Sequence, residues 1–184
     1  MNNNKIKPII SNYGVTLKRL TEDKIEMVRC WRNDPKIQQY MEFREEITPE
    51  MQKAWFSSIN NESNLFYIIE NNGKEIGLIN IKNIKEKKGE GGVFIWDDNS
   101  LNSDISYRAH LALFDLVFSI GLLNVIISHV LKDNIRAQRF TKFLGVKLAN
   151  NQDQKYNQMY TLLSNDYFLN KNRERYVKRY KTLK

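Results

Sequence analysis

The segment from Tyr107 to Phe118 restricts the fold more than any other part of this 184-residue chain. When the segment is placed on a helix, its apolar residues face almost every direction. They are Ala109, Leu111, Ala112, Leu113, Phe114, Leu116, Val117 and Phe118. A surface helix keeps its apolar residues on one stripe, so a helix that is apolar all round must be covered on most sides. We therefore expect a central helix that packs against a sheet.

Six segments carry the patterns of strands, either a high density of β-branched residues or alternation of apolar and polar residues. The predicted strands are Val15–Leu20, Leu65–Glu70, Glu75–Ile81, Gly91–Trp96, Asn124–Leu131 and Lys155–Leu163. The second and third are joined by Asn71-Asn72-Gly73-Lys74. Because Asn and Gly tolerate positive φ, these two strands are predicted to form a hairpin.

Helices are predicted between the first two strands. One covers Thr21–Trp31 and should break at Asn33-Asp34-Pro35, because the residue before proline avoids helical geometry. Another starts at Thr48-Pro49, a capping hydroxyl followed by proline at the first helical position. Its inner face is expected to consist of Met51, Trp55 and Ile59. Later in the chain, a polar loop is expected over residues 97–104.

The segment Lys132–Leu148 contains a helix with start and stop signals. Asp133 or Asn134 can accept from the free N–H groups at its start, and Gly145 supplies its end. Its apolar face consists of Ala137, Phe140 and Leu144. Together with a basic helix at the end of the chain, the order of elements predicts an α/β fold with helices on both faces of a mixed sheet.

The composition fits one domain. Hydrophobic residues make up 41% of the chain, which is enough for a core. We expect a single domain of residues 1–184 with a core of about residues 15–163. The formal charge is +8, and residues 165–184 carry seven Lys and Arg against two acids as a predicted basic tail helix. A positive surface attracts anions without distinguishing among them.

The reactive side chains are few. Cys30 is the one cysteine, so no internal disulfide can form, and His110 and His129 complete no zinc-ligand spacing. Both histidines are expected to be structural. The sequence has neither a signal-peptide pattern nor a run of 18 apolar residues. The expectation is a cytoplasmic, metal-free protein that does not bind a membrane.

Four fragments, in a plausible order, resemble the GNAT superfamily of acetyl-CoA-dependent N-acetyltransferases over about residues 15–163. They are WRNDPKIQQYM (Trp31–Met41), NNGKEIGLINI (Asn71–Ile81), EGGVFI (Glu90–Ile95) and DNIRAQRFTKFLGV (Asp133–Val146). The resemblance implies a three-layer α/β/α fold with a mixed, mostly antiparallel central sheet. The sheet should splay between Gly91–Trp96 and Asn124–Leu131, and acetyl-CoA should be the co-substrate.

The WRN motif, followed by a Met-ended loop and a Thr-Pro helix, looks most like the nucleotide-amino-sugar branch of this superfamily. Enzymes of that branch acetylate the amine of a UDP- or dTDP-linked 4-amino-4,6-dideoxy sugar in surface-polysaccharide or nonulosonic acid biosynthesis. Related WRND segments occur in the branch that acetylates the N-termini of ribosomal proteins. A protein or peptide N-terminal acetyltransferase is therefore an alternative, and the resemblance also admits a homodimer.

The resemblance implies that particular residues of this chain contact the cofactor. A backbone N–H near Val93, Phe94 and Ile95 would polarise the thioester carbonyl, because exposed backbone groups at the splay hold the cofactor arm. Asn134 and Phe140 would contact the same molecule.

Other residues are assigned to the acceptor and its proton. Glu90 would relay the proton of the amine, usually through water. Arg32 could pair with a nucleotide phosphate, for which its planar fork is suited. The acceptor pocket would be lined by Arg32, Asn33, Met41, Asn80 and Lys82.

The turn that should hold the cofactor pyrophosphate departs from the family. It lies within residues 99–106, where the family has a Gly-rich turn that opens the central helix, and this chain has neither Gly nor Arg there. Asp104 falls near a glycine position, where a carboxylate would repel phosphate. Ser103 and Ser106 are small enough to leave a cradle, and Arg108 could supply positive charge.

The position of the family's acidic tyrosine, which protonates the coenzyme A thiolate, is Thr141 in this chain. An alcohol is a much weaker acid than a phenol, whose pKa is about 10. Water or another tyrosine, such as Tyr156 or Tyr160, would have to serve. The altered turn and this substitution make a non-catalytic GNAT-fold binding protein a further alternative.

A module that contacts RNA through the basic tail is the last alternative. Single-stranded nucleic acid is held by stacking on aromatic side chains. Few aromatics lie outside the expected core, so a nucleic-acid partner is not expected.

Overall fold

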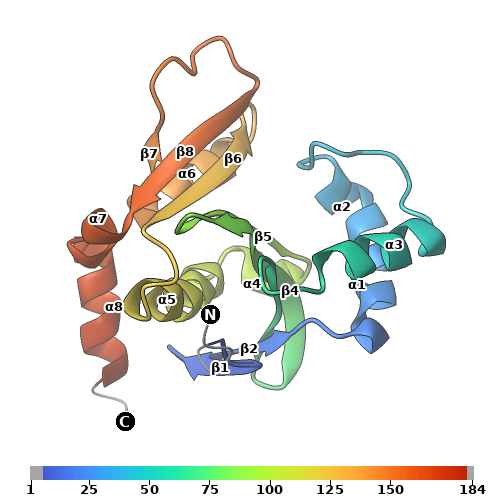
Figure 1. Ribbon diagram of the computed structural model, residues 1–184, viewed down its shortest axis with the longest axis horizontal. Coiled ribbons are helices and arrows are strands. Elements are labelled where there is room, and N and C mark those ends of the chain that lie inside the picture. The colour runs from blue at the N-terminus through green and yellow to red at the C-terminus, as the bar shows by residue number, and fades with distance from the viewer. Residues whose placement is uncertain (1–5, 182–184) are drawn as a thin grey trace.

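The computed structural model describes residues 6–181 (Figure 1). The first five residues, on which the expected absence of a signal peptide depends, and the last three of the predicted tail lie outside the described residues. The strands form one eight-stranded sheet in the order β1-β2-β3-β4-β5-β6-β8-β7. They are β1 (Ile9–Asn12), β2 (Val15–Arg19), β3 (Leu65–Asn71), β4 (Lys74–Lys85), β5 (Lys88–Ile95), β6 (Val125–Leu131), β7 (Lys147–Leu148) and β8 (Asn157–Leu163).

The sheet is mixed because β5 and β6 run parallel, whereas the other neighbouring strands are antiparallel. The parallel pairing covers three residues of each strand and ends at Glu90 and Ile127. Residues 91–95 of β5 therefore have no strand partner on the edge that faces β6. The sheet splays at this point, which confirms the fold expected from the sequence.

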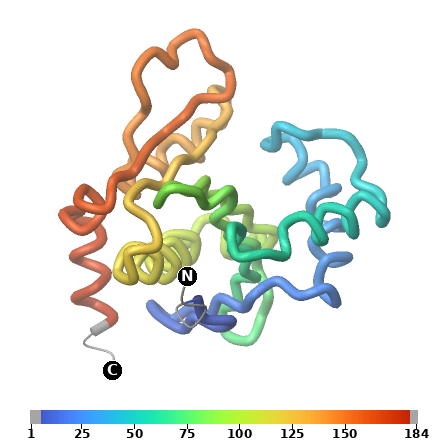
Figure 2. The backbone as a smooth tube through the Cα atoms, in the orientation of Figure 1, coloured from blue at the N-terminus to red at the C-terminus, as the bar shows by residue number. Residues whose placement is uncertain are grey.

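Helices cover both faces of the sheet and complete three layers. On one face lie α1 (Ile25–Asn33), α2 (Pro35–Gln38) and α3 (Pro49–Ile59), and on the other lie α5 (Ile105–Ser119), α6 (Ile135–Leu144) and α8 (Lys171–Lys181). The short helices are η2 (Glu22–Lys24), α4 (Asp98–Leu101) and α7 (Ser164–Phe168). Ten of the 15 residues of α5 are buried, so the predicted central helix is covered on most sides. Figure 2 shows α1–α3 and the group of β6, α6, β7 and β8 on opposite sides of the splayed end of β5.

Helix termini form where the sequence has capping residues. Thr48 Oγ1 accepts from the N–H of Met51 at 3.3 Å. Asn134 Oδ1 accepts from the N–H of Ala137 at 3.0 Å, so Asn134 caps α6. Gly145 closes α6 with a φ of +84°, a conformation that favours glycine. These caps depend only on residues a few positions apart, which is why the sequence predicted them.

Several short elements were not predicted, namely β1, β7, α2, α4 and α7. β1 and β7 have four and two residues, too few to show a period. β1 is joined to β2 by Tyr13 and Gly14, both with positive φ, as the tightest antiparallel hairpins require. α4 replaces part of the expected polar loop, because Asp97 accepts from the N–H of Ser100 at 3.0 Å and starts a single helical turn.

The predicted inner face of α3 was right for Trp55 and Ile59, which pack against the core, and wrong for Met51, which is exposed. Gln52 and Phe56 are the buried residues of α3. The Gln52 amide is compatible with burial because its Nε2 donates to the Ile25 carbonyl at 2.9 Å. This hydrogen bond to α1 lets a polar residue join the buried side of α3.

The C-terminal helix is anchored to the body through Asp115 of α5. Arg173 Nε donates to Asp115 Oδ1 at 2.9 Å, and the Tyr167 hydroxyl donates to the same oxygen at 2.7 Å. The Tyr13 hydroxyl donates to the other oxygen. Burial, followed by the hydrogen bond and the charge of Asp115, raises the pKa of Tyr13 and of Tyr167, so both remain protonated donors.

Candidate active site

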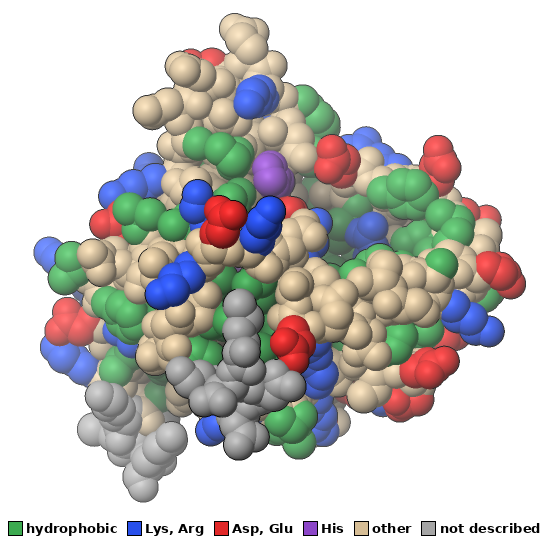
Figure 3. Space-filling model, viewed as in Figure 1, with side chains coloured by type: hydrophobic (Ala, Val, Ile, Leu, Met, Phe, Trp, Pro, Cys, Tyr) green, Lys and Arg blue, Asp and Glu red, His purple; other side chains and the backbone are tan. Residues whose placement is uncertain are grey.

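A cleft of ≈ 1280 Å³ opens where β5 and β6 diverge. Its walls come from α1–α3 and the loop between them, from β4, β5 and β6, and from the starts of α5 and α6. In the space-filling view, the surface is hollowed between the part that carries β6, α6 and β8 and the part that carries α1–α3 (Figure 3). The splay of the sheet therefore opens a large concave site.

Glu90 belongs to the last parallel pair of β5 and β6, where the two strands begin to diverge and the cleft starts. Lys82, its antiparallel partner on β4, places Nζ 3.0 Å from Glu90 Oε1. His129 on β6 places Nδ1 3.5 Å from the same oxygen. Three strands thus bring a carboxylate, an ammonium and an imidazole together, and such a group can accept and pass on a proton.

The free edge of β5 forms the floor of the cleft. Val93 and Ile95 pack against the core on the α5 side, and Phe94 packs against the core on the α1–α3 side. Alternate backbone groups of an antiparallel strand point away from its partner, so some N–H groups of residues 91–95 face the cleft. They are suited to donate to an oxygen on which negative charge develops.

Helix α6 contributes to the wall its cap residue Asn134 and, farther along, Phe140 and Thr141. The Asn134 oxygen is used by the cap, which leaves its Nδ2 group as the free polar end. Thr141 is only 5% exposed, and its hydroxyl donates to the carbonyl of Ala137. This hydroxyl is unsuited to protonate a ligand in the cleft.

The start of α5 supplies Ser103 and Ser106 to the cleft. The first N–H groups of a helix have no acceptor within the helix and favour anions. Ser103 Oγ accepts one of them, from Ile105, at 3.2 Å. The N–H groups of Ser106 and Tyr107 follow in the same turn.

Asp104 and Arg108 do not line the cleft, contrary to the expected contacts with the cofactor. Arg108 Nε donates to Asp104 Oδ1 at 2.9 Å, and Nη1 donates to the carbonyls of Tyr13 and Gly14 at 3.0 and 3.1 Å. The β1–β2 turn, which was not predicted, supplies these acceptors and draws the guanidinium away from the cleft. The repulsion expected from Asp104 is reduced because its carboxylate is paired.

His110 is a buried wall residue of the cleft. Burial lowers its pKa to about 4, although the bond to the Ser106 carbonyl opposes this shift. A carbonyl only accepts, so the neutral ring donates from Nδ1 to Ser106 O, at 2.7 Å. The ring edge also packs against Phe140, with ring centroids 5.0 Å apart.

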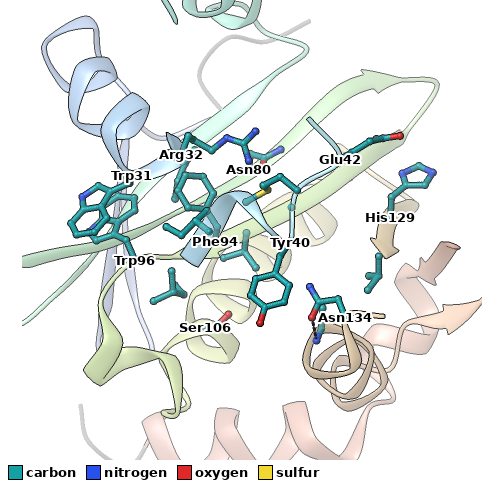
Figure 4. Close-up of a pocket in the computed structure, with 18 of the residues that line it drawn as sticks. Trp31, Arg32, Tyr40, Glu42, Asn80, Phe94, Trp96, Ser106, His129 and Asn134 are labelled. Atoms are coloured by element: carbon teal, nitrogen blue, oxygen red, sulfur yellow. Dashed lines mark hydrogen bonds between the residues drawn. The ribbon is translucent and has the colours of Figure 1, made fainter. Parts of the chain in front are cut away.

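The far end of the cleft is aromatic. Trp31 and Trp96 are stacked, with centroids 5.8 Å apart and planes within 5° (Figure 4). The Arg32 guanidinium lies over the Phe94 ring at 5.9 Å from its centroid, next to Asn80. Burial lowers the pKa of Arg32, and within residues 6–181 no acidic side chain or carbonyl pairs with it. A partly buried cation without a counter-ion is suited to bind an anionic ligand.

A loop over residues 39–47 forms the remaining wall and carries Tyr40 and Met41. Asn33 was expected in the pocket, but its side chain is used to hold this loop. Its Oδ1 accepts from the N–H of Ile47, and its Nδ2 donates to the carbonyl of Ile47, both at 2.9 Å. Arg29 Nη1 donates to the same carbonyl at 2.8 Å.

Residues 15–147 match the family model described as an acetyltransferase (GNAT) domain. The chain belongs to the GNAT acetyltransferase family. It is therefore an N-acetyltransferase, as the sequence resemblance implied. No curated protein sequence matches this acetyltransferase.

Solved structures share the fold of this acetyltransferase at low sequence identity. Apo FdhC, described as a nucleotide-linked sugar GNAT, has a TM-score of 0.76 and 17% identity, over 93% of this chain and 98% of that chain. Spermidine N-acetyltransferase from Vibrio cholerae, in complex with CoA and spermine, has a TM-score of 0.73 and 17% identity, over 85% and 99%. RimL, a ribosomal L7/L12 alpha-N-protein acetyltransferase in complex with coenzyme A, has a TM-score of 0.70 and 15% identity, over 84% and 97%.

No group of three His, Cys, Asp or Glu side chains among the described residues of this acetyltransferase could hold a metal ion. No helix within residues 6–181 is long and apolar enough to cross a bilayer.

Several residues of the acetyltransferase cleft were missed from the sequence, among them His129 and Tyr40. His129 was expected to be structural, yet it lies beside Glu90. The available signal was its place in a strand that was expected to line the splay. It lies just after Ile127, the last residue of β6 that pairs with β5, where side chains face the splay. Tyr40 precedes Met41, which was assigned to the pocket, and nothing in the sequence indicated its direction.

The two tyrosines considered as replacements for Thr141 lie outside the cleft. The Tyr156 hydroxyl donates to Asp133 Oδ2 at 2.6 Å. Tyr160 is buried within β8, next to Gln158. Neither is in a position to contact a ligand there.

Proposed function

We propose that this acetyltransferase transfers the acetyl group of acetyl-CoA to the amine of a nucleotide-linked sugar, of the 4-amino-4,6-dideoxy class. The observation that carries the proposal is the Arg32 guanidinium, which lies partly buried and without a counter-ion beside aromatic rings. A nucleotide offers both an anion for this group and a planar base for the aromatic end. A polyamine would instead place a second cation beside Arg32.

Acetyl-CoA fits the residues of the donor side. The free edge of β5 offers backbone N–H groups for the thioester carbonyl, and Asn134 Nδ2 is available to the pantetheine arm. The first turn of α5, with Ser103 and Ser106, offers N–H groups to the pyrophosphate. With Arg108 turned away, these dipoles take the place of a side-chain cation.

Glu90 is the proposed base. Its carboxylate accepts the amine proton, directly or through one water. Lys82 and His129 hold the carboxylate where β5 and β6 begin to diverge. The N–H groups of β5 stabilise the charge that develops on the carbonyl oxygen of the acetyl group. The amine, rather than a hydroxyl, is acetylated because loss of one proton leaves it a good nucleophile.

The test measures release of coenzyme A with a panel of acceptors: a UDP- or dTDP-linked 4-amino-4,6-dideoxy sugar, the same amino sugar without its nucleotide, spermidine, and a peptide with a free N-terminus. We expect the nucleotide sugar to have the highest kcat/KM. Arg32→Met should raise its KM by roughly 10- to 100-fold, the size of a charge-assisted hydrogen bond. Arg32→Lys should have an intermediate effect, because it keeps the charge and loses the fork.

Two internal controls make the result specific. The KM of acetyl-CoA and turnover of the sugar without nucleotide should be the same in the native protein and in Arg32→Met. Preference for the peptide or for spermidine would contradict the proposed acceptor. Failure to release coenzyme A with every amine would favour a binding protein.

A further inference from the structure

We propose that Tyr40 is the proton donor to the departing thiolate of coenzyme A. This inference rests on the proposed acetyl transfer but not on the identity of the amine. Tyr40 lies in the loop over residues 39–47. The family resemblance assigns no residue of this loop to acid catalysis.

The reaction needs a donor that the α6 helix does not offer. Thr141 is buried and its hydroxyl is bonded to a carbonyl of its own helix. His110 is neutral, and its one ring proton is donated to Ser106 O. Ser106 and Ser128 also line the cleft, but alcohols are weaker acids than a phenol.

Tyr40 is the one tyrosine among the described residues that line the cleft. Its ring points into the cleft, with the hydroxyl end toward the space between Ser106 and Asn134 (Figure 4). Those two residues mark the donor side, at the starts of α5 and α6. No residue within the described part of the chain hydrogen-bonds to the Tyr40 hydroxyl, so its proton is available to a ligand.

The loop holds Tyr40 in this direction. The N–H of Tyr40 donates to the carbonyl of Ile37 at 3.0 Å, which continues the turn at the end of α2. Farther along the loop, the Asn33 side chain forms hydrogen bonds with both the N–H and the carbonyl of Ile47. Arg44 Nε donates to the carbonyl of Met41 at 3.0 Å. The backbone on both sides of Tyr40 is therefore fixed before the cofactor binds.

The step balances without another reactant. The acetyl carbon has bonded to the amine nitrogen, whose proton has passed to Glu90. The carbon–sulfur bond then breaks and sulfur keeps the electron pair, while the Tyr40 O–H proton moves to sulfur. The products are the amide and neutral coenzyme A thiol. Glu90 then releases its proton to solvent and the tyrosinate regains one from solvent, which reaches it because the side chain is 53% exposed.

The test compares Tyr40→Phe with Tyr156→Phe. Tyr156 is matched in exposure, at 52%, and its hydroxyl lies outside the cleft. Release of coenzyme A is measured with the best amine of the acceptor panel. We expect Tyr40→Phe to lower kcat by about 10²-fold, the lower end of acid catalysis, with KM for acetyl-CoA unchanged. Tyr156→Phe should match the native protein.

One further readout separates proton donation from a structural role. Calorimetry should give the same Kd of coenzyme A for the native protein and for Tyr40→Phe. Native kcat in Tyr40→Phe, or a loss of coenzyme A binding, would each overturn the proposal.

The outcome is distinguishable from that of the proposed function. Activity with a peptide or a polyamine in place of the nucleotide sugar would remove the proposed acceptor and leave the Tyr40 comparison decisive. A native protein that releases no coenzyme A with any amine would overturn both.

Discussion

Burial without a charged partner separates Arg32 and His110 from the other ionisable side chains of the cleft. Glu90 has Lys82 and His129 beside it, and its charge is balanced before any ligand arrives. Burial disfavours the charged form of both Arg32 and His110, and their pKa values are lowered. Histidine responds by remaining neutral, whereas arginine stays charged at any physiological pH and retains the capacity to bind an anion.

Neutral His110 makes stability depend on pH in a defined direction. An unfolded histidine binds a proton near pH 6.5, and folded His110 does so only near pH 4. The unfolded state therefore binds more protons in this window, and stability is lost as pH falls from 6.5 toward 4. By pH 5 the loss from this residue should be about 2 kcal/mol.

Urea unfolding of the native protein and of His110→Gln between pH 7.5 and 5 tests this expectation. The variant should be less stable at neutral pH, since a buried ring is replaced. The difference between the two free energies of unfolding should then shrink by about 2 kcal/mol on acidification. A difference independent of pH would mean that His110 takes up its proton at the same pH in the folded and unfolded states.

Among the elements, the loop over residues 39–47 is held at Ile47 by two side chains of α1, Asn33 and Arg29. The side-chain amide of Asn33 donates one hydrogen bond to the backbone of Ile47 and accepts another, as a neighbouring strand would. Asn33→Ala should lower stability by about 1–3 kcal/mol, as expected for unsatisfied backbone groups. It should also lower acetyl transfer, because Tyr40 and Met41 would no longer be held at the cleft.

Asn61→Ala is the matched control for this substitution. Asn61 also fixes a turn through its side chain, accepting from the N–H of Ser63 at 3.0 Å and donating to the Ser58 carbonyl at 2.8 Å. It lies outside the cleft. Both variants should be destabilised, and only Asn33→Ala should lose activity and show faster amide hydrogen exchange over residues 39–47. Equal activities would show that the loop does not need Asn33.

For the whole molecule, the C-terminal helix is a part of the domain core and not a separate basic extension. Asp115 receives donors from the β1–β2 turn, from α7 and from α8, so one carboxylate joins both ends of the described chain to α5. Tyr176, Val177 and Tyr180 of α8 pack against the same core. The charge of the tail is carried on the outward side of a docked helix.

Arg173→Met should weaken this docking. The free energy of unfolding should fall by about 1–3 kcal/mol, because a largely buried carboxylate loses its cation. Limited proteolysis should become faster near Leu169, which is 81% exposed at the start of the connection to α8. The control is Lys178→Met, which removes an exposed ion pair with Glu174 and should change stability by less than about 1 kcal/mol. Equal stabilities of the two variants would contradict an ionic anchor.

The sequence by itself determined the features that depend on near neighbours. The all-round apolar pattern predicted α5 as a buried helix, and Asn-Gly chemistry predicted the β3–β4 hairpin. Thr48 and Asn134 marked helix starts, since a cap and its N–H partner are three residues apart. The order of these elements, with the family fragments, was sufficient for the fold and for the general reaction.

Only the tertiary structure decided where the polar side chains point. Arg108 was expected at the cofactor and is held instead by carbonyls some 95 residues earlier in the chain. Asn33 was expected at the substrate and is held by Ile47, and Tyr40 faces the cleft because that same loop is fixed. A side chain takes the direction in which distant elements satisfy its hydrogen bonds, and the sequence near a residue contains no record of those elements.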